Sequence, residues 1–123
     1  IKGPDHTALI TDSMRASGMP EGEYILGNIN SGLKVITEEG VAKLPDRSAF
    51  AGSIATTDRL VRTMIDLAEI PLFDAIKMIT ATPARIIKMS DSIGSIKVGM
   101  DADLLIFDER IKVKMTMIKG RIV

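Results

Sequence analysis

A short apolar run, Ala8–Ile10, stands directly before the polar residues Thr11, Asp12 and Ser13. Three small or aliphatic residues are too few to make the apolar face of a helix. They are typical of a strand that is buried on both faces of a parallel sheet. The run therefore predicts a buried strand with an acid at its end.

The following stretch, residues 16–53, is rich in glycine, proline, asparagine and serine. Between these breakers lie apolar pieces of strand length, at Tyr24–Leu26, Leu33–Thr37 and Val41–Leu44. Because the apolar pieces recur at intervals suited to strands, the stretch predicts small hairpins and not a disordered linker.

Apolar residues at three- and four-residue spacing predict three helices between residues 56 and 89. Thr56 or Thr57 is the expected N-cap of the first helix, because either hydroxyl can bond a free backbone N–H. The expected apolar face of this helix is Leu60, Val61, Met64, Ile65, Leu67 and Ala68. The second helix is expected to begin at Pro71, with a buried face of Leu72, Ala75, Ile76 and Ile79. The third is expected over residues 84–89, with Thr82 as the cap before Pro83.

The last thirty residues predict strands. Leu104–Phe107 is a second short apolar run, and residues 111–117 alternate apolar side chains with lysine or threonine. This period of two predicts a half-buried strand. Lys119–Gly120 then predicts a hairpin turn into a closing strand.

Composition excludes several classes of partner. The chain has 123 residues, and its 16 Lys and Arg balance its 16 Asp and Glu, so no excess of cations favours nucleic acid or an anionic membrane. No apolar run approaches the roughly 20 residues that span a bilayer. Cysteine is absent, which excludes disulfides and thiolate metal sites and favours a cytoplasmic location.

Asp12 is the first candidate for chemistry. The carboxyl ends of the strands in a (β/α) barrel carry the catalytic groups, and Asp12 follows a predicted strand. The alternative is an Asx turn, in which the side chain accepts a backbone N–H bond where the strand ends. The residues around Asp12 do not decide between the two.

The loop Phe50–Ile54 is the second candidate. Gly52 permits close approach of the backbone, and free N–H groups of the next helix suit a phosphate or sugar oxygen. Alternatively, Gly52 and Ser53 are only the turn and cap before that helix.

His6 is the single histidine, and one imidazole cannot supply a site that needs two or three nitrogen ligands. We expect it to be exposed and structural.

The order of motifs resembles one known family. TDSMRASG, AFAGS, TATPARII, GSIKVGMDADLLIFDE and IKGRIV occur in the order found in the C-terminal portion of the N-acetylglucosamine-6-phosphate deacetylases of the amidohydrolase superfamily. The last two motifs are general to the superfamily, and TDSM with FAGS is narrower. Ser13 stands where the family commonly has alanine, Asn28 replaces a glycine, and Asp46-Arg47-Ser48 replaces Asp-Gly-Thr.

The resemblance implies a fold and a set of roles. It implies the C-terminal part of a metal-dependent-hydrolase (β/α)8 barrel over residues 1–93, with its last strand, hairpins and last helices. Residues 94–123 would be C-terminal strands of a small β-sandwich domain. Asp12 would be the catalytic acid–base group, which takes a proton from a metal-bound water and returns it to the departing amine. Phe50, Ala51 and Gly52 would contact the amino-sugar phosphate.

The resemblance also implies what lies elsewhere. The family's metal ligands are a glutamate and two histidines upstream of the aspartate, so we expect a zinc or iron site whose ligands are not in this chain. A full barrel takes about 250 residues, so we expect a fragment that is inactive alone and a homo-oligomeric full enzyme. Two alternatives stay open, another amidohydrolase such as a dihydroorotase-like enzyme and a non-catalytic phosphosugar-binding module.

Overall fold

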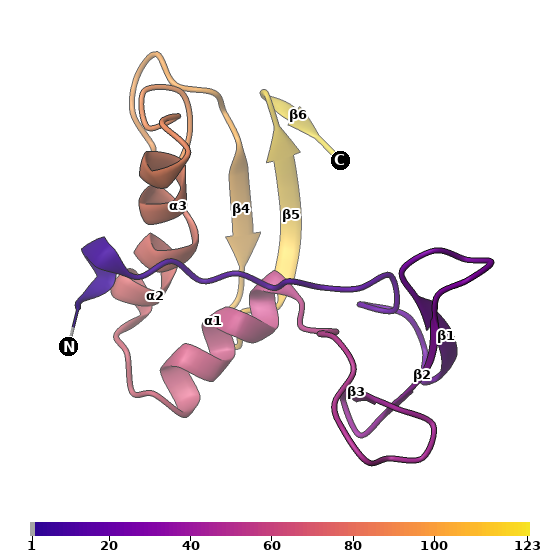
Figure 1. Cartoon of the computed structure of the whole chain (residues 1–123). Helices are drawn as coiled ribbons and strands as arrows, with labels where there is room; N and C mark the ends of the chain where they lie inside the picture. The colour runs from indigo at the N-terminus through magenta and orange to yellow at the C-terminus, as the bar shows by residue number, and fades with distance from the viewer. Residues whose placement is uncertain (1) are drawn as a thin grey trace. The chain divides into compact units, whose positions relative to one another are not determined.

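The computed structural model describes residues 2–123, and contacts within the chain divide it into two compact units. The hairpin unit is Thr11–Thr56, and the helix–sheet unit combines Ile1–Ile10 with Thr57–Val123. Figure 1 labels their helices and strands. The predicted domain boundary near residue 94 stays a prediction.

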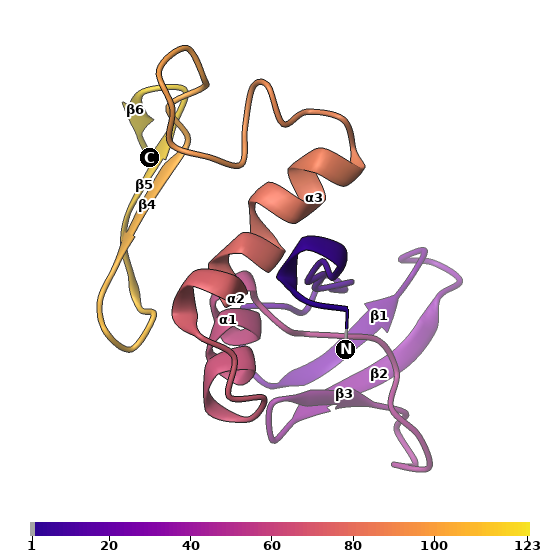
Figure 2. The same ribbon diagram turned by 90° about the vertical axis from the view of Figure 1, so that its left-hand side faces the viewer.

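The hairpin unit contains one antiparallel sheet in the order β1-β2-β3 (Figure 2). Its strands are β1 (Gly22–Leu26), β2 (Leu33–Glu38) and β3 (Val41–Lys43), close to the three predicted pieces. Glu39 and Gly40 join β2 to β3, and both have positive φ, at 53° and 73°. Positive φ at both positions belongs to the tight hairpin turn whose twist matches that of the strands. The buried core of the unit is Met14, Ala16, Val35, Ala42 and Ala51.

The helix–sheet unit begins with a short 3₁₀ helix, η1 (Pro4–His6), and contains α1 (Thr57–Asp66), α2 (Leu72–Ile79) and α3 (Ala81–Ile86). Figure 2 shows η1 against α2 and α3, which it contacts. All three predicted helices are present, but α3 ends at Ile86 and not at residue 89, and Leu72, predicted in the buried face of α2, is 46% exposed. Because α1 ends at Asp66, Leu67 lies outside the helix and is 81% exposed, against the prediction for its apolar face.

Thr82 corrects the predicted start of the third helix. This residue lies inside α3 and is not its cap, because the helix already begins at Ala81. Its side chain is 2% exposed, and its Oγ1 donates to the carbonyl oxygen of Pro4 at 2.7 Å. Thr82 therefore ties α3 to η1, a long-range contact that local capping patterns do not predict.

The second sheet is also antiparallel, in the order β4-β5-β6. Its strands are β4 (Leu104–Phe107), β5 (Val113–Ile118) and β6 (Arg121–Ile122). Lys119 and Gly120 have φ of 48° and 79°, as the predicted hairpin turn requires. Ile111 does not start the strand, since its φ is 57° and its buried side chain belongs to the core around Val61.

The opening apolar run differs from its prediction. Residues 8–10 form no strand among residues 2–123, and Ile10 is 81% exposed. The Leu9 N–H donates to the carbonyl oxygen of Met78 at 2.9 Å, so a helix residue supplies its partner. A strand of a parallel sheet takes its hydrogen bonds from neighbouring strands, and the described chain places none beside this run.

No helix within residues 2–123 has the length and apolar character that crossing a membrane requires.

Glu38, at the end of β2, is held by two cations. Arg47 bonds it through two of its three guanidinium nitrogens, with Nε 2.9 Å from Oε1 and Nη2 3.0 Å from Oε2. The Nζ of Lys43 lies 3.2 Å from Oε1. Hydrogen bonds from Arg47, and then from Lys43, lower the pKa of the Glu38 carboxyl. Because the folded-state pKa is the lower one, this contribution to stability exists near neutral pH and is lost as the pH falls through the acidic range.

We expect Glu38→Gln to reduce the acid sensitivity of the protein. Urea denaturation at about pH 7 and about pH 3 measures the loss of folding free energy on acidification, which should be smaller in the variant than in the wild type. Glu23→Gln is the matched control, because this exposed carboxylate of β1 has no ion pair within residues 2–123. Equal acid sensitivity in wild type and Glu38→Gln would contradict the prediction.

Candidate functional site

Asp12 is exposed in the hairpin unit, and its backbone is left-handed, with φ of 45°. Its carboxylate has no hydrogen-bond or ion-pair partner within residues 2–123. In contrast, Asp46 accepts a bond from the N–H of Ser48 at 3.0 Å, and Asp108 accepts one from the N–H of Arg110 at 3.0 Å. The chain thus forms Asx turns at Asp46 and Asp108 and forms none at Asp12. This leaves the Asp12 carboxylate open to solvent.

The predicted binding segment, Phe50–Gly52, is held against β3. Phe50 forms an isolated antiparallel bridge with Lys43, and the Ala51 N–H donates to the carbonyl oxygen of Ala42 at 2.9 Å. The Ala51 side chain is 6% exposed and lies in the core of the unit. Phe50 is 77% exposed.

The residues after Asp12 pair with the residue after Gly52. Ser13 and Ser53 form an isolated parallel bridge, and the Met14 N–H donates to the carbonyl oxygen of Ser53 at 2.8 Å. The two candidates from the sequence, 38 to 40 residues apart along the chain, are therefore adjacent in the backbone of one unit.

Gly52 lies next to this pairing and has a backbone conformation that favours glycine. Its φ is 86°, a conformation that side chains disfavour. A Cβ at this position would lie 3.3 Å from the Met14 sulfur and 3.5 Å from a methyl carbon of Leu26. Gly52 is thus more than a generic turn residue, because its backbone angle strains any residue with a side chain and a Cβ would require the Met14 side chain to shift slightly. The predicted use of helix N–H groups by this loop stays a prediction.

Two serines, Ser13 and Ser17, link the same loop to the segment after Asp12. The sequence predicted no role for the hydroxyl of either. The hydroxyl of Ser13 donates to the carbonyl oxygen of Ala55. The hydroxyl of Ser17 donates to the carbonyl oxygen of Ile54 at 3.2 Å and to that of Ala55 at 3.4 Å. The departure from alanine at Ser13 was the sequence signal that could have indicated this contact.

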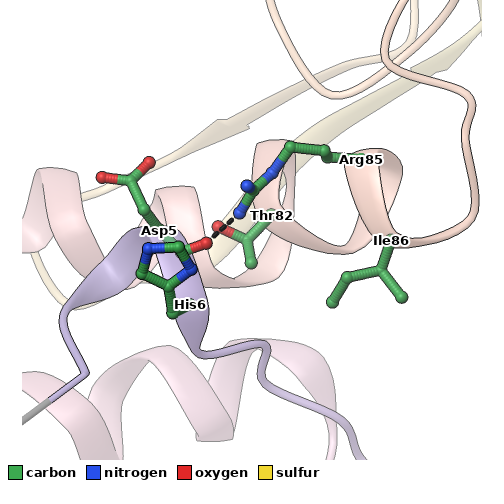
Figure 3. A pocket seen from close by; sticks show the side chains of 5 residues that line it. All are labelled: Asp5, His6, Thr82, Arg85 and Ile86. Atoms are coloured by element: carbon green, nitrogen blue, oxygen red, sulfur yellow. Dashed lines mark hydrogen bonds between the residues drawn. The ribbon is translucent and has the colours of Figure 1, made fainter.

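His6 lies in a separate feature of the helix–sheet unit. A pocket of about 360 Å³ is lined by Asp5, His6, Thr82, Arg85 and Ile86 (Figure 3). Arg85 and Asp5 are already bonded: the Arg85 guanidinium donates to the Asp5 carbonyl, and the Asp5 carboxylate lies 2.6 Å from Lys77 Nζ. The hydrogen bond from Lys77 lowers the pKa of Asp5. The exposed position predicted for His6 is confirmed.

The described residues do not fit a metal centre. Within residues 2–123, no group of three or more histidine, aspartate or glutamate side chains is arranged to hold a metal ion. The chemistry that these residues offer is that of one free carboxylate beside a loop with an exposed aromatic ring.

Comparison with known proteins places this arrangement in a family. The profile of the amidohydrolase family matches residues 28–123. The N-acetylglucosamine-6-phosphate deacetylase of Lysinibacillus sphaericus is 42% identical over 122 residues, which are 99% of this chain and 30% of that protein. A putative N-acetylgalactosamine-6-phosphate deacetylase of Escherichia coli K12 is 33% identical over 96% of this chain and 68% of its own length.

Solved structures are similar over the whole chain. A mutant N-acetyl-D-glucosamine-6-phosphate deacetylase from Mycobacterium smegmatis, in complex with N-acetyl-D-glucosamine-6-phosphate, has a TM-score of 0.84 and 31% identity. The match covers 98% of this chain and 31% of that one. The N-acetylglucosamine-6-phosphate deacetylase from Pasteurella multocida, 24% identical with a TM-score of 0.87, shares the fold over 97% of this chain and 30% of its own.

These matches confirm the predicted fold class, the C-terminal part of a hydrolase barrel with part of its small β domain. The chain spans about 30% of the length of the Lysinibacillus deacetylase, which agrees with the expectation of a fragment. The family profile covers most of the chain. The chain belongs to the amidohydrolase family.

Proposed function

We propose that the protein containing this chain is a deacetylase that hydrolyses N-acetylglucosamine-6-phosphate to glucosamine-6-phosphate and acetate. The observation that carries the proposal is the pairing of Ser13 with Ser53, which brings Asp12 and Phe50–Gly52 together in one unit. The relative at 42% identity, which bears the name of such a deacetylase, supports the choice of substrate.

Asp12 is the proposed acid–base group. Its carboxylate removes a proton from water as the water oxygen bonds to the carbonyl carbon of the acetamide. The same proton then passes to the nitrogen as the C–N bond breaks, so the products are acetate and a free amine. The absence of an Asx turn supports this role, because an acceptor bonded to its own backbone is less available for proton transfer.

Phe50, Ala51 and Gly52 are the proposed substrate-contacting residues. The exposed ring of Phe50 offers an apolar surface to the sugar, and Ala51 anchors the segment in the core. Gly52 allows the backbone to approach a ligand closely. Membership of the amidohydrolase family implies a divalent metal, and we propose zinc or iron held by residues outside this chain. We also propose a homo-oligomeric, cytoplasmic enzyme.

N-acetylgalactosamine-6-phosphate is the second candidate substrate. Two relatives from Escherichia coli strains, each 33% identical over 96% of this chain, bear the name of a deacetylase for that sugar. The two sugars differ only in the configuration of one hydroxyl, so both deserve a direct test. A dihydroorotase-like activity also stays a candidate, because the family profile is general to amidohydrolases.

A substrate panel tests the proposal. The protein containing this chain is assayed with N-acetylglucosamine-6-phosphate, N-acetylgalactosamine-6-phosphate and dihydroorotate, and release of acetate or ring opening is measured. The highest kcat/KM is expected with the first substrate. Hydrolysis of dihydroorotate alone would overturn the proposal. Calorimetry on the 123-residue chain distinguishes the deacetylase from the non-catalytic phosphosugar-binding module. Saturable binding of the sugar phosphate without metal would favour the module.

We expect Asp12→Asn in that protein to lower kcat by at least about 100-fold, because the amide cannot accept or return the proton. Steady-state kinetics measures the change, and metal content measured by mass spectrometry should stay at the wild-type level. Asp91→Asn is the control, since Asp91 is an exposed carboxylate outside the candidate site. Wild-type turnover in Asp12→Asn would refute the acid–base role.

We expect Gly52→Ala to raise KM and to destabilise the protein by more than the roughly 1–2 kcal/mol that a left-handed residue with a Cβ costs. The matched control is Gly18→Ala, at a φ of 75° against 86° for Gly52, because a Cβ at Gly18 meets nothing within 4 Å. Urea denaturation and substrate titration compare the two variants. Equal stability losses together with an unchanged KM would contradict the prediction.

A further inference from the structure

The position of the Asp12 carboxylate depends on its backbone. The left-handed conformation, with φ of 45°, is uncommon for a residue with a side chain and persists where surrounding contacts hold it. Within residues 2–123 the carboxylate itself has no hydrogen bond or ion pair that would fix its direction. Whatever holds the next residues in place therefore fixes the backbone position and the Cα–Cβ direction from which the carboxylate extends.

Two bonds hold those residues. The Ser13 hydroxyl donates to the carbonyl oxygen of Ala55, a residue 42 positions further along the chain. The Met14 N–H donates to the carbonyl oxygen of Ser53 at 2.8 Å. Both acceptors lie in the loop directly after Gly52, so a side-chain bond and a backbone bond attach the segment after Asp12 to that loop.

Ser17 reaches the same loop from a point further from Asp12. Its hydroxyl donates to the carbonyl oxygens of Ile54 and Ala55, at 3.2 and 3.4 Å. The Ala55 carbonyl thus accepts from two serines, of which only Ser13 is next to Asp12. Removing either hydroxyl loosens the loop, but only loss of the Ser13 hydroxyl frees the residue next to the carboxylate.

We propose that Ser13 is a positioning residue for the reaction, because its bond to Ala55 holds Asp12 beside the Phe50–Gly52 segment. The inference rests on the proposed deacetylase function of the protein that contains this chain. Ser13 acts through Asp12 and through the loop, and it needs no contact with the substrate. Loss of its hydroxyl reduces the fraction of molecules in which the carboxylate has the reactive geometry.

Kinetics of three variants in that protein test the proposal. Ser13→Ala should lower kcat about tenfold, since small misplacements of a reacting group are costly, and should leave KM within about twofold. Ser13→Thr keeps a hydroxyl and should restore kcat to within about threefold of wild type. Ser17→Ala should leave kcat within about twofold, because the residue next to Asp12 remains bonded. A Ser13→Ala kcat within twofold of wild type, or an equal loss in Ser17→Ala, would overturn the proposal.

Hydrogen exchange provides a measurement that does not depend on activity. The Met14 amide should exchange about tenfold faster in Ser13→Ala than in wild type, because its bond to Ser53 then opens more often. Ser17→Ala should change this rate less. An unchanged Met14 rate in Ser13→Ala overturns the proposal. A wild-type protein that hydrolyses neither sugar phosphate overturns the proposed function instead, and the exchange rates then decide separately whether Ser13 holds this backbone.

Discussion

The hairpin unit depends on a single short parallel contact. Where Ser13 meets Ser53, the segment that carries Asp12 is joined to the segment that carries Gly52, and the Met14 side chain enters the core beside Ala51. Glycine at position 52 favours this contact, since its φ of 86° is strained for other residues and a Cβ there would lie 3.3 Å from the Met14 sulfur. The antiparallel sheet also holds this region, because the Ala51 N–H donates to the carbonyl oxygen of Ala42 in β3. This contact sets the position of the segment after Asp12 relative to the Phe50–Gly52 segment.

Electrostatics supports the same unit from its edge. The carboxylate of Glu38 accepts two bonds from Arg47, which stands at a φ of 59° in the loop that leads to Phe50. A left-handed arginine is disfavoured, and the paired bonds of its guanidinium offset part of that cost. The departure from glycine at position 47 is therefore accompanied by an ion pair that glycine cannot make.

Local sequence patterns predicted most helices and strands. They failed at residues whose conformation depends on contacts with distant segments of the chain. The pieces that became β1, β2 and β3 were predicted from their apolar residues and turn punctuation. Thr82 was predicted as a helix cap from its place before Pro83, yet it lies within α3, where its hydroxyl donates to the carbonyl oxygen of Pro4. Ile111 was placed in a strand by its alternation, but its side chain packs in the core beside Val61, and its backbone turns.

The opening run, Ala8–Ile10, is a second case in which a local pattern did not determine the structure. Ala8–Ile10 has the composition of a buried parallel strand, but such a strand exists only when other strands pair with it. Within residues 2–123 it has no strand partner, and Ile10 remains exposed. The apolar pattern alone therefore does not make a strand, because the described residues supply no partner for it.

By itself, the sequence determined the family, the kinds of element and the identity of the candidate acid, because motifs, periodicity and turn residues are local properties. The residues around Asp12 left open whether its side chain makes an Asx turn, and the sequence predicted no role for the hydroxyl of Ser13. The tertiary structure shows that Asp12 makes no such turn within residues 2–123 and that the Ser13 hydroxyl donates to the carbonyl oxygen of Ala55. Whether a carboxylate is bonded to its own backbone, and which distant carbonyl accepts from a serine, depends on segments that meet across 42 residues of chain.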